Sequence, residues 1–358
     1  MGRKRIGGRS MTGRGPCYPP VVVLSSGRCG STMLSNMLNL HPDLLSVSEF
    51  FTLHNLALFS RWRMTGDGMW RVLIRQPQLV RYLLKEDYEE LLYPFDDTAS
   101  RFGRDTVPPI LCVTLPHLTN RYESLFDELE PVVRNFPRQS PASHCRSLFE
   151  WLCGRFDRKV WVERSGGSSM YASRLINRFP EAKVINMHRD GREVALSMSR
   201  HHPFRGIAPY IIALQKRRYD PFRVEAKHSE FWDSVALRLQ PLKYLSRFPI
   251  PMPADRLEIA HFGAIWSSMV EAAQDFIQNL PPERVLDVRF DDLQQNAEPE
   301  LRRIIRFMSS DLENEDWVQE AAGIPRPSRS RFARLDPEER AALTEACRPG
   351  LERLGYAV

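Results

Sequence analysis

The residues best suited to chemistry in this chain lie in a short glycine-rich stretch, SSGRCGST at positions 25–32. The four residues before it are apolar, and Leu34, Met37 and Leu38 recur at helical spacing after it. This pattern predicts a buried strand that leads through a turn into a helix. The first N–H groups of such a helix and the positive end of its dipole converge on one spot and bind phosphate or sulfate. Arg28 adds a full positive charge with a forked donor geometry suited to these anions.

We therefore expect an anion-binding loop in which glycines allow the tight turn and hydroxyl residues supply donors. Its members are Ser26, Gly27, Arg28, Cys29, Gly30, Ser31 and Thr32. The Walker loop of ATPases and kinases, GxxxxGK followed by Ser or Thr, is longer and needs a lysine that is missing here.

A second candidate anion site follows another predicted strand, KVINMH at residues 183–188. Asp190 is suited to cap the next helix, and Glu193, three residues later, would complete a capping box. Arg189 would then lie at the carboxyl end of the strand, with Ser197 two turns into the helix. Ligands bind at this end of the strands in an open α/β sheet. We expect both candidate sites at the same rim of one sheet.

Together, the two segments resemble the sulfotransferases that use 3′-phosphoadenosine 5′-phosphosulfate (PAPS). The loop resembles their 5′-phosphosulfate loop, and Arg189 with Ser197 resembles their 3′-phosphate element, an Arg and a Ser eight residues apart. The similarity is greatest to the branch of tyrosylprotein and many bacterial sulfotransferases. In that branch R-x-G-[ST]-T precedes a helix, a His-Pro pair and a glutamate, here His41-Pro42 and Glu49.

The resemblance implies direct in-line transfer of a sulfuryl group from PAPS to an acceptor hydroxyl, with release of adenosine 3′,5′-bisphosphate (PAP). Glu49 matches the general base, and the short connection at 44–48 would return it to the sheet rim. Arg28 would hold the 5′-phosphosulfate and stabilise the leaving phosphate. Arg164 stands where relatives carry a lysine that contacts the sulfate; its planar fork keeps the charge but not the compact ammonium.

The resemblance also assigns the 3′-phosphate, which distinguishes PAPS from ATP, to Arg189 and Ser197. The basic segment at 325–332 (PRPSRSRF) would close over PAPS through Arg326 and Arg331; an exposed basic loop is the alternative. No metal is expected, since arginines take the place of the Mg²⁺ of a kinase.

Two other functions stay open. One is a small-molecule kinase on a similar scaffold, which would need ATP and Mg²⁺. The other is a catalytically inactive nucleotide-binding module. The hydroxyl-bearing acceptor is equally open among a peptide tyrosine, a glycan, a lipid and a small metabolite, and a homodimer is one option for the assembly.

The alternation of strand and helix patterns predicts an α/β fold with a mainly parallel sheet flanked by helices. The resemblance implies that this is the P-loop NTPase-like fold of sulfotransferases, with helical insertions. The alternation of patterns predicts one domain over 19–358, with acceptor-binding insertions at about 51–157 and 203–260. Strands are expected near 21–25, 110–114, 159–163, 183–188 and 285–290, and helices near 168–179, 266–280, 298–308 and 337–354.

Charge and composition favour a soluble enzyme. Of the net charge of +6, +5 comes from a basic tail at 1–18 that holds five basic and no acidic residues. We expect this tail to be disordered, and the near-neutral remainder argues against a nucleic-acid partner. The six cysteines form no CxxC pair, which fits a reducing compartment. No apolar run is long enough to span a membrane. We expect a cytoplasmic protein.

Overall fold

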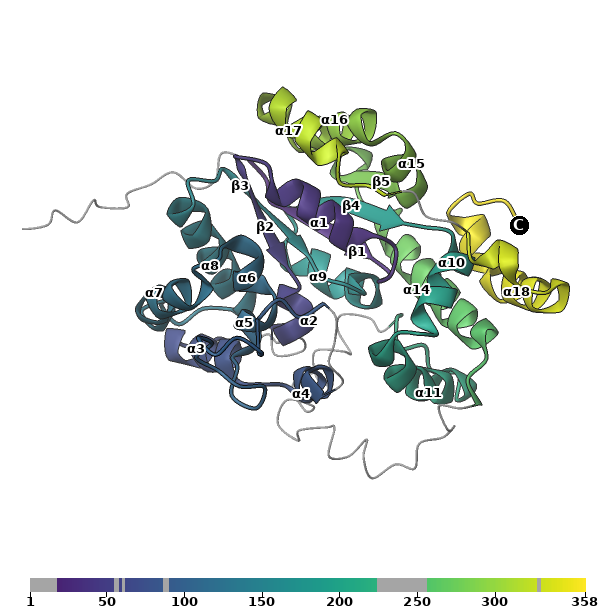
Figure 1. Cartoon of the computed structure of the whole chain (residues 1–358), viewed down its shortest axis with the longest axis horizontal. Coiled ribbons are helices and arrows are strands. Elements are labelled where there is room, and N and C mark those ends of the chain that lie inside the picture. Colours follow the sequence, from purple (N-terminus) through teal and green to yellow (C-terminus); the bar gives the residue numbers. More distant parts are fainter. Residues whose placement is uncertain (1–17, 55–57, 60–61, 86–89, 224–255, 327–329) are drawn as a thin grey trace, which may run out of the picture.

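A five-stranded, all-parallel sheet forms the centre of the protein in the computed structural model (Figure 1). The structure describes residues 18–54, 58–59, 62–85, 90–223, 256–326 and 330–358. The strand order is β2-β3-β1-β4-β5. The strands are β1 (Val21–Ser25), β2 (Leu44–Ser48), β3 (Val160–Arg164), β4 (Lys183–His188) and β5 (Val285–Arg289). The predicted fold class is confirmed.

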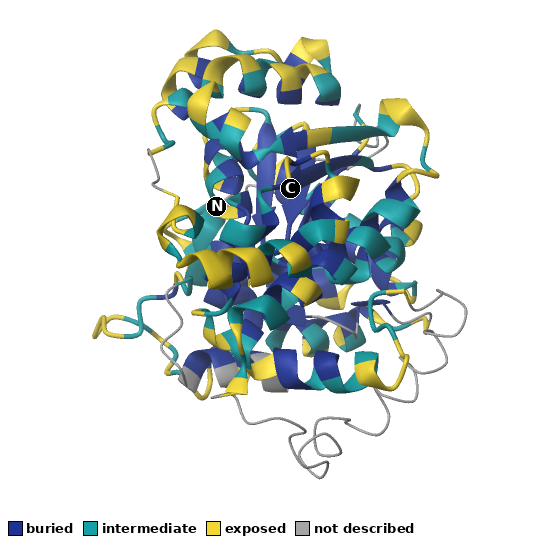
Figure 2. Cartoon of the chain, turned by 90° about the vertical axis from the view of Figure 1, so that its right-hand side faces the viewer, coloured by how far each residue is buried: buried dark blue, intermediate teal, exposed yellow. Residues whose placement is uncertain are grey.

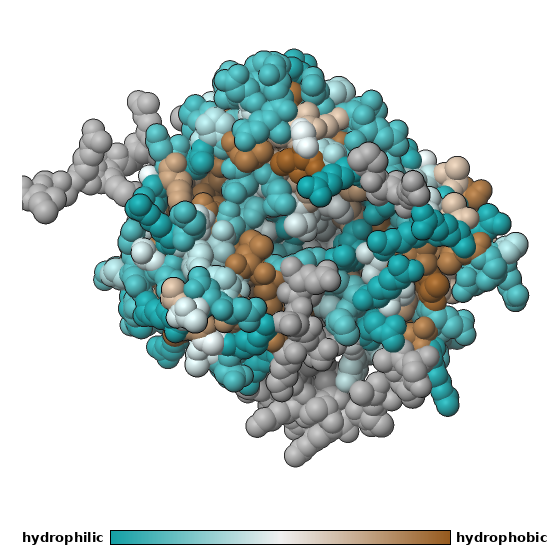
Figure 3. Space-filling view, in the orientation of Figure 1, coloured by the Kyte–Doolittle hydropathy of each residue, from teal (hydrophilic) through white to brown (hydrophobic). Residues whose placement is uncertain are grey.

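Helices cover both faces of this sheet. Along β1, Val22 and Leu24 belong to one apolar core and Val21 and Val23 to the other, because successive side chains of a strand point to opposite faces. This explains the uninterrupted apolar sequence of β1, which is typical of a parallel strand buried on both sides. In Figure 2 most of the sheet is dark blue, whereas the edge strand β5 is largely intermediate and the outer helices carry exposed residues. Hydrophilic residues cover most of the face in Figure 3.

The first face packs mainly against helices from the first half of the chain, together with the C-terminal end of α14 (Ile259–Ile277). The helices from the first half are α2 (Phe50–His54), α3 (Gly66–Ile74), α4 (Gln78–Lys85), α5 (Pro109–Cys112), α6 (Thr114–Leu118), α7 (Tyr122–Arg134), α8 (Pro141–Arg155), the 3₁₀ helix η2 (Ser168–Tyr171) and α9 (Ala172–Arg178). The predicted helical character of the described residues between 51 and 157 is thus confirmed.

The second face packs against α1 and the later helices. These are α1 (Ser31–Asn39), α10 (Gly191–Met198), α11 (His202–Lys216), α14 (Ile259–Ile277), α15 (Phe290–Gln295), α16 (Ala297–Met308), α17 (Glu315–Ala322) and α18 (Pro337–Arg353), with short 3₁₀ turns η4 (Pro282–Arg284), η5 (Ser310–Leu312) and η6 (Phe332–Arg334).

Two elements differ from the prediction. The expected strand at 110–114 is wrong, since α5 and the start of α6 occupy it, and α5 begins with Pro109 at its first turn. A short apolar run fits a buried helix as well as a strand. The connection expected at 44–48 is itself β2, the edge strand paired with β3. The expected disordered tail falls on residues 1–17, outside the described residues, as do residues 224–255 of the second insertion.

Candidate active site

The loop between β1 and α1 adopts a backbone that only certain residues tolerate. Gly27 and Gly30 have φ of 73° and 87°, and Arg28 has φ of 57°. A Cβ at Gly30 would lie 2.1 Å from Cδ2 of Phe290. Glycine is therefore required at position 30 both by the positive φ and by the lack of space for a side chain. Within the described part of the chain, no acceptor contacts the backbone N–H groups of Gly30, Ser31 and Thr32. These donors at the start of α1 are therefore available to an anion.

The Arg28 side chain links this loop to two distant segments. Its Nε donates a hydrogen bond of 3.1 Å to Oγ of Ser197 on α10, and its Nη1 forms an ion pair with Glu90. Ser31 lies below, donating from Oγ to Ser25 Oγ at 3.1 Å. The side chains of Ser26 and Cys29 are buried beneath the loop, so any contact that they make with an anion is through the backbone.

Arg189 follows β4 at the same rim. Its guanidinium lies over the ring of Phe290, 4.5 Å from the centroid, and Nη2 is 4.0 Å from a carboxylate oxygen of Glu193. Its Nε is buried and has no hydrogen-bond partner among the described residues. A buried donor of this kind is costly unless a partner binds it. Arg189 therefore retains a donor for an anion in the cavity.

Glu193 does not close the expected capping box. Asp190 caps α10 by accepting from the Arg192 N–H at 2.9 Å, as predicted. Oε1 of Glu193 instead accepts from Ser330 Oγ at 2.7 Å, from the Arg331 N–H at 2.8 Å and from the Phe332 N–H at 2.9 Å. A loop contact more than 130 residues away outcompetes the local cap and holds the C-terminal segment against α10.

The two arginines expected in that segment lie in different places. Arg331 lines the cavity together with Arg334. Arg326 is exposed and outside the cavity lining, and its carbonyl oxygen accepts from Gln294 Nε2 at 2.5 Å. The neighbouring residues 327–329 are outside the described part of the chain.

Glu49 directly follows β2, and its carboxylate is held from two sides. Its φ of 57° is left-handed, a conformation that non-glycine residues adopt at an energetic cost and that often marks functional sites. The Gly166 N–H donates to both carboxylate oxygens at 3.1 and 3.0 Å, and Arg164 forms an ion pair with Oε1. Only 7% of Glu49 is exposed, and it lies at the cavity wall.

Arg164 ends β3 and is almost fully buried. Besides pairing with Glu49, it donates from Nη2 to Ser48 Oγ at 2.8 Å. Its Nε has no partner among the described residues. Arg164 therefore fixes the direction of the Glu49 carboxylate while neutralising its charge.

A second carboxyl group, Glu163, lies behind this pair and was not expected from the sequence. It accepts from Ser165 Oγ at 2.6 Å and from the Phe51 N–H at 3.4 Å. Ser165 Oγ in turn accepts from the N–H groups of Phe51 at 3.0 Å and Thr52 at 3.2 Å. Complete burial, helped by the negative charge of Glu49, raises the pKa of Glu163 to about 8. Through these accepted hydrogen bonds the Glu163 carboxyl group anchors the start of α2, directly after Glu49.

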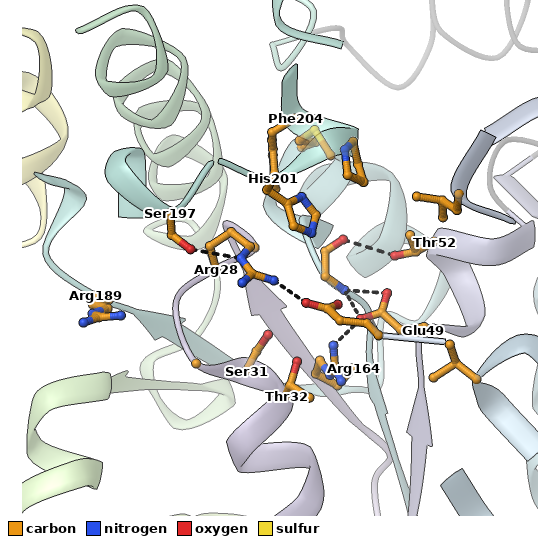
Figure 4. Close-up of a pocket in the computed structure, with 18 of the residues that line it drawn as sticks. Arg28, Ser31, Thr32, Glu49, Thr52, Arg164, Arg189, Ser197, His201 and Phe204 are labelled. Carbon is orange, nitrogen blue, oxygen red and sulfur yellow. Dashed lines mark hydrogen bonds and ion pairs between the residues drawn. The ribbon is translucent and has the colours of Figure 1, made fainter. Parts of the chain in front are cut away.

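These residues surround a cavity of about 720 Å³. In Figure 4, Arg189 and Ser197 lie on one side of Arg28, and Glu49, Arg164 and Thr52 on the other. Most of the predicted site residues line it, namely Gly27, Arg28, Gly30, Ser31, Thr32, Glu49, Arg164, Arg189, Ser197 and Arg331. Their arrangement suits a ligand with several anionic groups.

The lining also includes residues that the sequence did not single out. Glu90 pairs with Arg28 across 62 positions, Phe290 supports Arg189, and a Cβ at Gly27 would lie 2.9 Å from Cζ of Phe204. The contacts of these residues join segments that are far apart in the chain, so no local sequence pattern predicts that they belong to the site. Of these three residues, only Phe290 could have been placed near the site from the sequence, because it directly follows a predicted strand.

Among the described residues, no helix is both long and apolar enough to cross a membrane. No curated protein matches the chain. Among solved structures, the sulfotransferase domain from the curacin biosynthetic pathway is 14% identical, with 95% of this chain and 99% of that chain covered and a TM-score of 0.47. The sulfotransferase domain of the Synechococcus PCC 7002 olefin synthase is 15% identical, with 96% and 98% covered and a TM-score of 0.45.

A third structure, sulfotransferase STF9 from Mycobacterium avium, is 16% identical, with 96% of this chain and 78% of that chain covered and a TM-score of 0.44. A model of the sulfotransferase family matches residues 19–236 and 245–314. That match includes the anion loop, Glu49, Arg164, Arg189 and Ser197. The chain belongs to the sulfotransferase family.

Proposed function

We propose that the protein transfers a sulfuryl group from PAPS to the hydroxyl group of an acceptor and releases PAP. The observation that carries the proposal is the hydrogen bond from Arg28 to Ser197. This bond joins the loop after β1 to the helix after β4, the two elements that we propose bind anionic groups, in a cavity that Glu49 lines from the other side. A nucleotide with separate 5′ and 3′ anionic groups fits this arrangement.

The donors that line the site support the same ligand. The N–H groups at the start of α1 and the Arg28 guanidinium would hold the 5′-phosphosulfate. Arg189, with its unpartnered Nε, and Ser197 would hold the 3′-phosphate. Arg331 and Arg334 add positive charge to the lining. PAPS supplies the sulfuryl group; the chain supplies binding, orientation and a base.

Glu49 would accept the proton of the acceptor hydroxyl as the oxygen attacks sulfur from the side opposite the leaving phosphate. A general base has to be within hydrogen-bond reach of that proton, and its carboxylate must be aimed. Gly166 and Arg164 aim it. Arg28 would stabilise the charge that develops on the leaving group.

The proposed sulfuryl donor can be tested by the thermal stability of the purified protein. The shift in melting temperature is compared among PAP, AMP and ATP with Mg²⁺. We expect PAP to give the largest shift, because only PAP carries both groups that the two elements bind. A larger shift with ATP and Mg²⁺ would instead favour a kinase. Transfer of label from radiolabelled PAPS to an acceptor tests catalysis, and PAP binding without transfer to any acceptor would indicate an inactive module.

A further inference from the structure

Apolar side chains also line the cavity that Glu49 lines. Among its lining residues, Leu53, Leu83, Val113 and Phe204 are each less than 10% exposed. They come from α2, α4, the junction of α5 and α6, and α11. Elements from both sequence insertions thus contribute to the apolar part of the cavity lining, which we call the apolar wall.

Contacts within the fold fix this wall beside the base. Leu53 is one helical turn after Glu49, and its N–H donates to the Glu49 carbonyl oxygen at 3.0 Å. Thr114 Oγ1 donates to the Ser48 carbonyl oxygen at 2.8 Å, which ties the segment with Val113 to the end of β2. A molecule whose hydroxyl reaches Glu49 therefore lies in a cavity that aliphatic and aromatic carbon also lines.

An apolar side chain continues the wall toward solvent. Ile207 on α11 lines the cavity although it is 41% exposed. An exposed large aliphatic residue at a cavity lined by others extends the apolar surface that a ligand covers.

The carboxylates of the cavity lining disfavour a negatively charged acceptor. Glu49 and Glu90 both line the cavity, and their carboxylates pair with Arg164 and Arg28. An acidic peptide would meet these two carboxylates, and the arginines beside them, Arg28 and Arg164, are already paired with them. A sugar would leave hydroxyl groups against apolar carbon, which is costly without hydrogen bonds. Thr52 Oγ1 already donates to the Gly166 carbonyl oxygen at 3.1 Å.

We propose that the acceptor is an apolar alcohol, a hydroxyl group on a hydrocarbon body, which lies along Leu53, Val113, Phe204 and Ile207 while its oxygen reaches Glu49. This inference rests on the proposed sulfotransfer. The hydroxyl oxygen forms the new bond to sulfur, the bond from sulfur to the phosphate oxygen breaks, and Glu49 takes the hydroxyl proton. Each methylene group added to the alcohol buries more carbon against the wall.

A series of primary n-alkanols from butanol to decanol tests the inference, with the affinity for the PAP-bound protein and the transfer of label from PAPS measured in parallel. Binding and kcat/KM should each rise about fourfold per methylene until the wall is covered. Trehalose and an acidic tyrosine-containing peptide should bind and react far less than octanol. Equal or better use of either, or no dependence on chain length, would overturn the inference.

A pair of matched variants distinguishes an apolar residue that lines the cavity from an exposed apolar residue elsewhere on the protein. Ile207→Gln should reduce the gain per methylene, whereas Leu92→Gln, at a residue 46% exposed and outside the cavity lining, should leave it unchanged. The same gain in affinity per methylene in the parent protein and in both variants would mean that Ile207 does not contact the acceptor. If PAP fails to stabilise the protein and no acceptor is labelled, the proposed function itself is wrong. If PAP stabilises the protein but the affinity for alkanols does not depend on chain length, only the proposed acceptor class is wrong.

Discussion

Arg28 and Ser197 are joined by a hydrogen bond of 3.1 Å, although 169 positions separate them in sequence. Arg28 belongs to the loop after β1, and Ser197 to the helix after β4. Because β1 and β4 are parallel neighbours, both loops leave the sheet at the same edge. The guanidinium of the loop after β1 therefore contacts the hydroxyl group of the helix after β4, and both residues line the same cavity.

Replacement of Arg189 tests the 3′-phosphate assignment. Arg189→Ala should weaken PAP binding by about 1.5–3 kcal/mol, because a charge-assisted contact is lost, and should affect AMP much less. Isothermal titration calorimetry measures both affinities. Arg326→Ala is the matched control, an exposed arginine outside the cavity, and should leave both unchanged. Equal losses for PAP and AMP in Arg189→Ala would place the 3′-phosphate elsewhere.

Replacement of Glu49 tests the base. Glu49→Gln should lower turnover by a factor of about 10² or more while PAP affinity stays nearly intact, since the amide oxygen still accepts from Gly166. Steady-state label transfer gives turnover, and calorimetry gives affinity. Glu90→Gln removes a carboxylate from the same cavity without removing the base, so its turnover should fall far less. Turnover unchanged in Glu49→Gln would exclude this residue as the base.

The local patterns were sufficient to predict much of the fold. The strand, glycine turn and helix around Arg28 were predictable because φ restrictions and apolar spacing act within a few residues. The strand at 183–188 and the Asp190 cap were predictable for the same reason. The predicted strand at 110–114 was wrong, because apolar burial alone does not distinguish a short helix from a strand.

Features set by contacts between distant segments were not predictable from one sequence. Glu193 has capping-box spacing, yet it bonds to the loop at 330–332. In the sequence, Glu163 is one more polar residue in a predicted strand. Its raised pKa follows from the burial of both faces of the sheet, which the sequence alone does not show. Ser197 was placed near the anion loop through the family resemblance, whereas its bond to Arg28 required the parallel pairing of β1 with β4.

The buried carboxyl of Glu163 should make stability depend on pH. Its pKa is raised from 4.5 to about 8 in the folded protein. Between these values the unfolded state loses the proton and the folded state keeps it, so the free energy of unfolding falls as pH rises. Glu163→Gln, which has no proton to lose, should flatten this fall and gain roughly a few kcal/mol over the parent at pH 8.

Chemical denaturation between pH 5 and pH 8 measures this dependence. Glu345→Gln, whose side chain is 71% exposed, is the control and should keep the slope of the parent protein. A slope unchanged in Glu163→Gln would mean that the carboxyl is already ionised at neutral pH. A shifted pH profile of turnover in the same variant would show that the anchor also positions Glu49.

Glu193 should hold the C-terminal loop over the site. Glu193→Ala removes the acceptor of three hydrogen bonds from Ser330, Arg331 and Phe332, so the segment with Arg331 and Arg334 should detach from α10. We expect faster tryptic cleavage after these arginines and PAP affinity reduced by about tenfold, as for the loss of one charge-assisted contact. Glu193→Gln retains an acceptor oxygen and should recover part of both properties. Cleavage at the parent rate, with PAP affinity unchanged, would mean that the loop is held by other contacts and that Arg331 does not reach the ligand.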